Sequence, residues 1–148
     1  MNRVVVGTDG SPGADAAVEF AAREAALRAA TLRIVCAWGR PDTHYASAFA
    51  PHDDVGSAHR KAAHRICEEA RDRARQVEPS VDCETCAEKG HPATVLVDEA
   101  RNATLLVVGS RGLNGLKSIL MGSVGFQCAH QAPCPVVIVP GPGRATTN

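Results

Sequence analysis

The chain has 148 residues, of which 45% are hydrophobic, and its 16 basic and 16 acidic side chains give a formal net charge of zero. This length suits one domain with a substantial core, and the neutral balance argues against nucleic-acid-binding and membrane-surface proteins, because both rely on a basic field. Aromatic residues make up only 3%, so the core is expected to consist of alanine and aliphatic side chains.

The chain contains no apolar run near the roughly 20 residues that a membrane-spanning helix needs. Its first residues carry one arginine and three valines before the polar Thr8 and Asp9, which is not the pattern of a signal peptide. We therefore expect a cytoplasmic protein.

The first third of the chain predicts a strand, a helix and a second strand. Residues 3–8 are short and apolar, as in a buried parallel strand. Ser11 suits a helix N-cap, with Pro12 at the first helical position. Residues 32–38 form the second apolar run. Small residues at helical spacing predict the inner face of the helix, namely Ala14, Ala17, Val18, Ala21 and Ala25.

The middle of the chain begins with residues 39–56, a segment of mixed composition that predicts a long loop suited to a lid or to binding. A helix is expected from near Ser57, with charged residues on its solvated faces. Its inner face is predicted to comprise Ala63, Ile66, Cys67, Ala70, Ala74 and Val77. Residues 81–87 form a more polar strand, which suits a sheet edge.

The last third of the chain follows the same alternation after a turn at residues 90–92. The predicted elements are a helix over 93–100, a strand over 104–108, a glycine-rich loop over 109–122, a helix over 123–131, a strand over 135–140 and a frayed tail over 141–148.

Strands that alternate with helices predict an α/β domain over residues 1–148, with a parallel sheet covered on both faces. Ligand sites in such sheets lie at the carboxyl ends of the strands, where the strand order reverses. The ends of the first and fourth strands are marked by Asp9 and Gly109, which makes them the first candidates for a site.

The glycine-rich segment has the spacing Gly109-x2-Gly112-x9-Gly122-Ser123. Glycines let backbone N–H groups approach an anion, and a helix N-terminus at Ser123 favours phosphate oxygens. The segment has no G-x-x-x-x-G-K-[ST] pattern, which excludes a P-loop. The glycines after the first strand do not form G-x-G-x-x-G, which excludes the dinucleotide-binding motif. Spacing alone leaves a phosphate site and a simple surface loop as equal alternatives.

The spacing resembles the ATP-binding motif of the universal stress protein family. Residues 4–11 resemble that family's opening strand and turn, and residues 132–139 resemble its closing strand, so the resemblance covers nearly the whole chain. It implies a flavodoxin-like, Rossmann-like sheet of five parallel strands in the order 3-2-1-4-5. It also implies a homodimer joined through the last strand, whose apolar edge needs covering. The residues of that edge are Val136, Val137, Ile138 and Val139.

The resemblance also implies an ATP site, with Mg²⁺ as the accompanying ion. Thr8 and Asp9 would lie beside the adenosine, with the Asp9 carboxylate available to ribose hydroxyls or the magnesium ion. A turn-forming role for Asp9 is the alternative. Ala37 would offer its backbone to adenine.

The phosphate side of the implied site lies in the glycine-rich segment. Two sets of residues follow from the resemblance: Gly109, Arg111 and Gly112 for ribose and phosphates, and Gly122, Ser123 and Val124 for the phosphate tail. Gly125 departs from the family pattern, in which serine or threonine is common, so one phosphate hydroxyl is expected to be missing.

The remaining reactive side chains favour structural roles. Cys83 and Cys86 form C-x-x-C in a strand-like run, without a second pair or nearby histidines for zinc. His59 and His64 are five residues apart, which does not place them on one helical face for a metal. No catalytic residue and no metal site is expected.

The sequence therefore predicts an ATP-binding regulator of stress response or signalling rather than an enzyme. The alternatives are a slow ATPase or ATP-dependent phosphotransfer enzyme, and a nucleotide-free dimerisation module.

Overall fold

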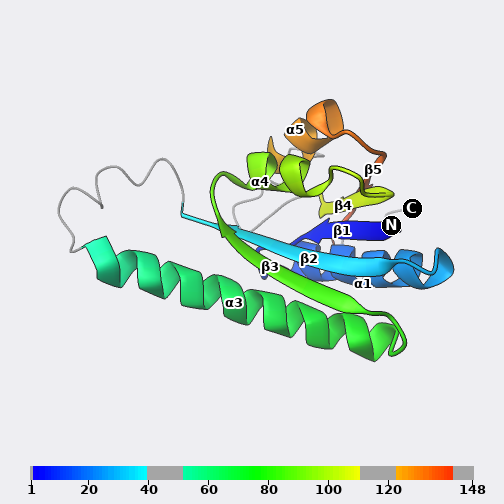
Figure 1. Ribbon diagram of the computed structural model, residues 1–148, viewed down its shortest axis with the longest axis horizontal. Helices are drawn as coiled ribbons and strands as arrows, with labels where there is room; N and C mark the ends of the chain where they lie inside the picture. The colour runs from blue at the N-terminus through cyan, green and yellow to red at the C-terminus, as the bar shows by residue number, and fades with distance from the viewer. Residues whose placement is uncertain (1, 40–51, 111–122, 142–148) are drawn as a thin grey trace, which may run out of the picture.

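The computed structural model describes residues 2–39, 52–110 and 123–141. Five parallel strands form one sheet in the order β3-β2-β1-β4-β5 (Figure 1), which confirms the predicted order. The strands are β1 (Arg3–Gly7), β2 (Thr31–Trp38), β3 (Cys83–Lys89), β4 (Leu105–Gly109) and β5 (Val136–Val139). The central segment 40–51 and the tail 142–148 lie outside the described residues.

Four described helices cover the sheet from both sides, and their bounds are α1 (Pro12–Leu27), α3 (His52–Val77), α4 (Pro92–Glu99) and α5 (Ser123–Gln131). Successive side chains of a strand face opposite sides. Val4 and Val6 of β1 accordingly pack with α1 and α3, while Val5 packs with α4 and α5. Figure 1 shows these two layers, with the N-terminal turns of α3 extending past the sheet. Burial on both faces explains the continuous apolar runs of the strands.

The central strand β1 pairs with β2 on one side and with β4 on the other. Val6 is paired with Val107. Thr8 and Gly109 each lie two residues farther along the chain, so they are neighbours at the carboxyl edge of the sheet. The strand order thus reverses at β1, which is the point where the sequence predicted a site.

The start of α1 agrees with its sequence signals. The Ser11 hydroxyl accepts a hydrogen bond from the Ala14 N–H at 3.2 Å, and Pro12 occupies the first turn. Alanines then bury the face of α1 that meets the sheet. Because these side chains are small, α1 lies close to the strands.

Two elements differ from the prediction by more than one residue at a boundary. Helix α3 begins at His52, several residues before Ser57, and runs through Gly56. A glycine inside a helix costs only about 1 kcal/mol relative to alanine, which the packing of a long helix offsets. Strand β3 spans Cys83–Lys89 rather than 81–87, because its pairing with β2 continues to the end of that strand. Its position at the sheet edge is as predicted.

Among the described helices, none combines the length and apolar character needed to cross a membrane.

The end of β4 makes the closest backbone approach to α1. A Cβ atom added to Gly109 would lie 3.0 Å from the carbonyl oxygen of Gly13 and 3.2 Å from its carbonyl carbon. Both neighbours are backbone atoms in the first turn of α1, so they cannot move away as a flexible side chain would. Glycine at position 109 is therefore required by packing, apart from any role in binding.

We expect Gly109→Ala to lower the free energy of unfolding by about 1–3 kcal/mol, because the first turn of α1 has to shift. Gly56→Ala is the matched control, since a Cβ there meets no atom within 4 Å. The free energy of unfolding of Gly56→Ala should not fall, and it should rise by up to about 1 kcal/mol through helix propensity. Urea denaturation of both variants measures the difference, and equal stability of Gly109→Ala and the wild type would contradict the steric argument.

Candidate functional site

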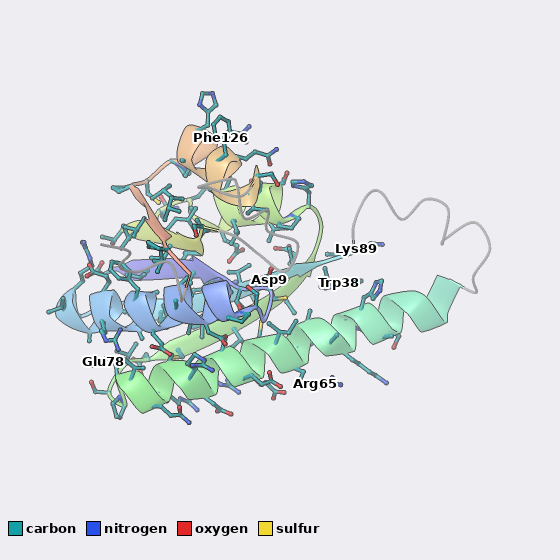
Figure 2. All side chains as sticks on the ribbon, turned by 180° about the vertical axis from the view of Figure 1, so that it is seen from behind. Asp9, Trp38, Arg65, Glu78, Lys89 and Phe126 are labelled. Atoms are coloured by element: carbon teal, nitrogen blue, oxygen red, sulfur yellow. The ribbon has the colours of Figure 1, made fainter. Side chains whose placement is uncertain are left out.

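The predicted site residues at the ends of three strands come together at one edge of the sheet. Thr8 and Asp9 follow β1, Gly109 ends β4, and Ala37 lies near the end of β2. Since β1 lies between β2 and β4, these residues occupy neighbouring positions. Figure 2 shows Asp9 on the same side of the molecule as Trp38 and Lys89, which end β2 and β3.

The turn after β1 is held by its own side chains. The Thr8 hydroxyl oxygen accepts a hydrogen bond from the Gly10 N–H at 3.1 Å, and Asp9 Oδ1 accepts one from the Ser11 N–H at 2.9 Å. Gly10 has a φ of +82°, a backbone conformation that favours glycine. Asp9 therefore has the turn-forming role that the sequence left open, and this bond orients its half-buried carboxylate at the edge.

Helix α3 supports this turn from below, through a contact that the sequence did not predict. A Cβ on Gly10 would lie 3.3 Å from Ile66 Cγ1. Ile66 and Trp38 each pack against a small buried cluster that contains Cys36 and Cys67. The apolar stripe of α3 identified Ile66 as a core residue, but its partner across the fold depends on how α3 crosses the sheet.

Ser110 is a residue of the site that sequence reasoning missed. It directly follows β4 and is only 4% exposed. Its N–H donates to the Val139 carbonyl at 2.9 Å, whereas its hydroxyl oxygen has no hydrogen-bond partner among the described residues. A polar residue directly after a buried strand is the available signal, but the glycine spacing favours a loop from Gly109 onward.

The buried polar side chains of the described residues gather at this edge. Three are found, Thr8, Ser11 and Ser110, and all lie just beyond the ends of β1 and β4. Burying a polar group costs free energy unless it is hydrogen-bonded. The edge is therefore the place where this fold accepts polar groups that its core excludes.

The phosphate side of the predicted site is described in part. Ser123 is the exposed first residue of α5, as predicted, and Val124, like Ala37, packs against the cluster that contains Val108. Gly125 is buried in α5, without a hydroxyl. Arg111, Gly112 and Gly122 lie outside the described residues.

The described cysteines are free thiols, and burial raises their pKa values. For Cys36 and Cys128 the pKa rises to about 12 and about 11 respectively. Cys83 packs with the cluster beneath α1 and α3, while Cys86 packs with the cluster beneath α4 and α5. The two thiols of the C-x-x-C pattern therefore lie on opposite faces of β3, where they cannot bind one metal together.

One group of possible metal ligands occurs among the described residues. Cys86, Glu88 and Glu99 each offer an atom, and these atoms lie within 4.8 Å of one another. Arg33 already donates a hydrogen bond to Glu99, which raises the pKa of the guanidinium, and it contacts Glu84 at 3.3 Å. The positive charge of Arg33 thus balances Glu99 and Glu84, and we assign Glu99 to an ion-pair network between β2, β3 and α4.

The arrangement of strands, turn and helices is shared with known proteins. Residues 1–140 match the universal stress protein family. The chain belongs to this family. This finding confirms the resemblance that the opening strand, the glycine-rich segment and the closing strand indicated.

Three relatives illustrate the match. Universal stress protein YxiE of Bacillus subtilis is 32% identical, over 94% of this chain and 99% of its own length. Universal stress protein MT3220 of Mycobacterium tuberculosis is 38% identical over 98% of this chain, which spans 51% of the mycobacterial protein. A universal stress protein whose crystal structure is in complex with cAMP has 35% identity and a TM-score of 0.67. The match covers 93% of this chain and 95% of that protein.

The raised pKa of Cys36 predicts a pH effect on stability. The thiol titrates near 9.0 when unfolded and near 12 when folded, so its contribution is complete below pH 9.0 and is lost as the pH rises toward 12. We expect the stability difference between wild type and Cys36→Ala to be largest near neutral pH and to shrink above pH 9.0. Urea denaturation across that range measures it, and a constant difference would show that the thiol is not protected by burial.

Proposed function

We propose that this universal stress protein is a cytoplasmic regulator that binds ATP with Mg²⁺ at the carboxyl edge of its sheet and acts as a homodimer. The observation that carries the proposal is the gathering of buried polar groups at the ends of β1 and β4, where the strand order reverses. Ligands of open parallel sheets bind at such points.

Each part of the nucleotide meets suitable chemistry in this arrangement. The Asp9 carboxylate accepts hydrogen bonds from ribose hydroxyls or binds the magnesium ion, and the backbone near Ala37 recognises adenine. The N–H groups of the first turn of α5 have no partner within the helix and carry a partial positive charge. They suit phosphate oxygens, together with the Ser123 hydroxyl and the sequence motif that precedes it.

The relative in complex with cAMP supports an adenine nucleotide as the ligand class, since it is 35% identical to this chain over most of both proteins. Asp9 accepts a hydrogen bond from its own turn. That bond favours a positioned binding group over a mobile general base, which supports a regulator. One alternative is a nucleotide-free module, which mass spectrometry of the purified protein would identify by the absence of co-purifying nucleotide. The other is a slow ATPase, which a turnover assay would separate from a regulator.

Substitutions at Asp9 separate its two roles. Asp9→Asn keeps an oxygen for the Ser11 N–H but removes the charge, so the turn should remain while ATP with magnesium binds about tenfold more weakly. Asp98→Ala removes an exposed carboxylate on α4 and should leave binding unchanged. Calorimetric titration measures both variants. Wild-type affinity in folded Asp9→Asn would exclude the carboxylate from the site.

Substitutions on the phosphate side test the sequence motif. Gly122→Val should abolish ATP binding, because a side chain intrudes on the anion, while the fold persists. Ser123→Ala should be milder, at about 0.5–2 kcal/mol, because the helix N–H groups remain. Folded Gly122→Val that binds ATP as tightly as the wild type would place the site elsewhere.

The proposed dimer uses the open edge of β5. The carbonyls of Pro135 and Val139 accept hydrogen bonds from β4, so the backbone groups of Val136 and Ile138 face away from it. Ile138→Pro removes an outward N–H without disturbing the β4 pairing, and should shift the protein toward monomer with little change in its thermal unfolding. Light scattering at a protein concentration of about 50 μM measures the oligomeric state. A monomeric wild type would count against the dimer.

A further inference from the structure

Ser110 has an unsatisfied hydroxyl in a position where burial is nearly complete. The side chain is 4% exposed, and within the part of the chain that the structure describes its Oγ has no hydrogen-bond partner. Thr8 and Ser11, the other buried polar residues of this edge, each accept a hydrogen bond from a backbone N–H of the following turn. Ser110 therefore differs from its neighbours in lacking a role in the fold that would explain its hydroxyl.

The alternation of β4 indicates the direction of this side chain. Leu106 and Val108 pack with the cluster beneath α4 and α5, whereas Leu105 and Val107 pack beneath α1 and α3. The N–H groups of Leu106 and Ser110 both point toward the last strand, since they donate to the carbonyls of Pro135 and Val139 respectively. Position 110 thus belongs to the side of the sheet that carries α5.

The start of α5 lies on that same side, because Val124 packs against the cluster that contains Val108. Unpaired N–H groups at a helix N-terminus attract anions, and a hydroxyl that donates to an anion forms a stronger bond than one that donates to a neutral group. The side of the sheet where Ser110 lies is therefore the side suited to phosphate.

We propose that the Ser110 hydroxyl donates a hydrogen bond to a phosphate oxygen of the bound adenine nucleotide. This inference rests on the proposed function and adds a phosphate-binding side chain to it. In the ligand-free protein the buried hydroxyl is a cost to stability, and the ligand removes that cost by supplying an acceptor. Ser110 is thus a residue that destabilises the empty protein and strengthens the complex.

This dual role gives Ser110→Ala two opposite effects. The thermal midpoint of the ligand-free protein should rise, by about 2–4 °C, because an unpaired hydroxyl is removed from the interior. Affinity for ATP should fall about five- to tenfold, while affinity for adenosine, which has no phosphate, stays unchanged. Ser110→Cys, with a weak donor of similar shape, should bind ATP with intermediate affinity. Ser80→Ala, at an exposed position, is the control and should change neither quantity.

Calorimetry with ATP, AMP and adenosine, together with thermal unfolding without ligand, distinguishes the outcomes. A lower midpoint and unchanged ATP affinity in Ser110→Ala would show a purely structural hydroxyl and overturn the inference. An equal loss for ATP and adenosine would place Ser110 against the nucleoside and also overturn it. If the wild type binds no adenine nucleotide, the proposed function itself fails. Normal wild-type binding with no effect of Ser110→Ala refutes this inference alone.

Discussion

The pairing of β1 with β2 on one side and β4 on the other is the constraint on which the rest of this structure depends. It buries the middle of β1, where three successive valines are fully inaccessible to solvent. It also divides the helices into two layers, because alternate side chains of the same strand require cover on opposite faces. The reversal of strand order at β1 leaves the ends of β1 and β4 adjacent at one edge of the sheet.

The thin packing layer between α1 and the sheet follows from composition. Alanines line the buried face of α1, and a protein with 3% aromatic residues has few side chains that could hold the helix farther away. One consequence is the contact between Gly109 and the backbone of Gly13, where no side chain fits. The same glycine thus meets a packing requirement and stands at the edge where a ligand would bind, so its presence alone does not separate structure from function.

The polar groups of this protein are distributed according to the free energy that their burial costs. The ion pairs of Arg33 and Arg73 lie at partly exposed positions, where such pairs add little to stability. The buried thiols remain protonated and behave as small apolar side chains, because burial opposes their ionisation. The hydroxyls of Thr8 and Ser11 are buried and bonded to backbone. Among the buried hydroxyls of the described residues at this edge, that of Ser110 lacks a hydrogen-bond partner, which the proposed phosphate contact would supply.

The sequence by itself determined the number of strands and the helix that begins at Pro12, because local periodicity and capping depend on neighbouring residues. The family and the strand order followed from its resemblance to the universal stress proteins. The tertiary structure alone decided the contact of Ile66 with Gly10, the opposite faces of Cys83 and Cys86, the pairing of Arg33 with Glu99, and the unpartnered burial of Ser110. Each of these joins segments distant in sequence or depends on what surrounds a side chain, and such relations exist only once the sheet has brought those segments together.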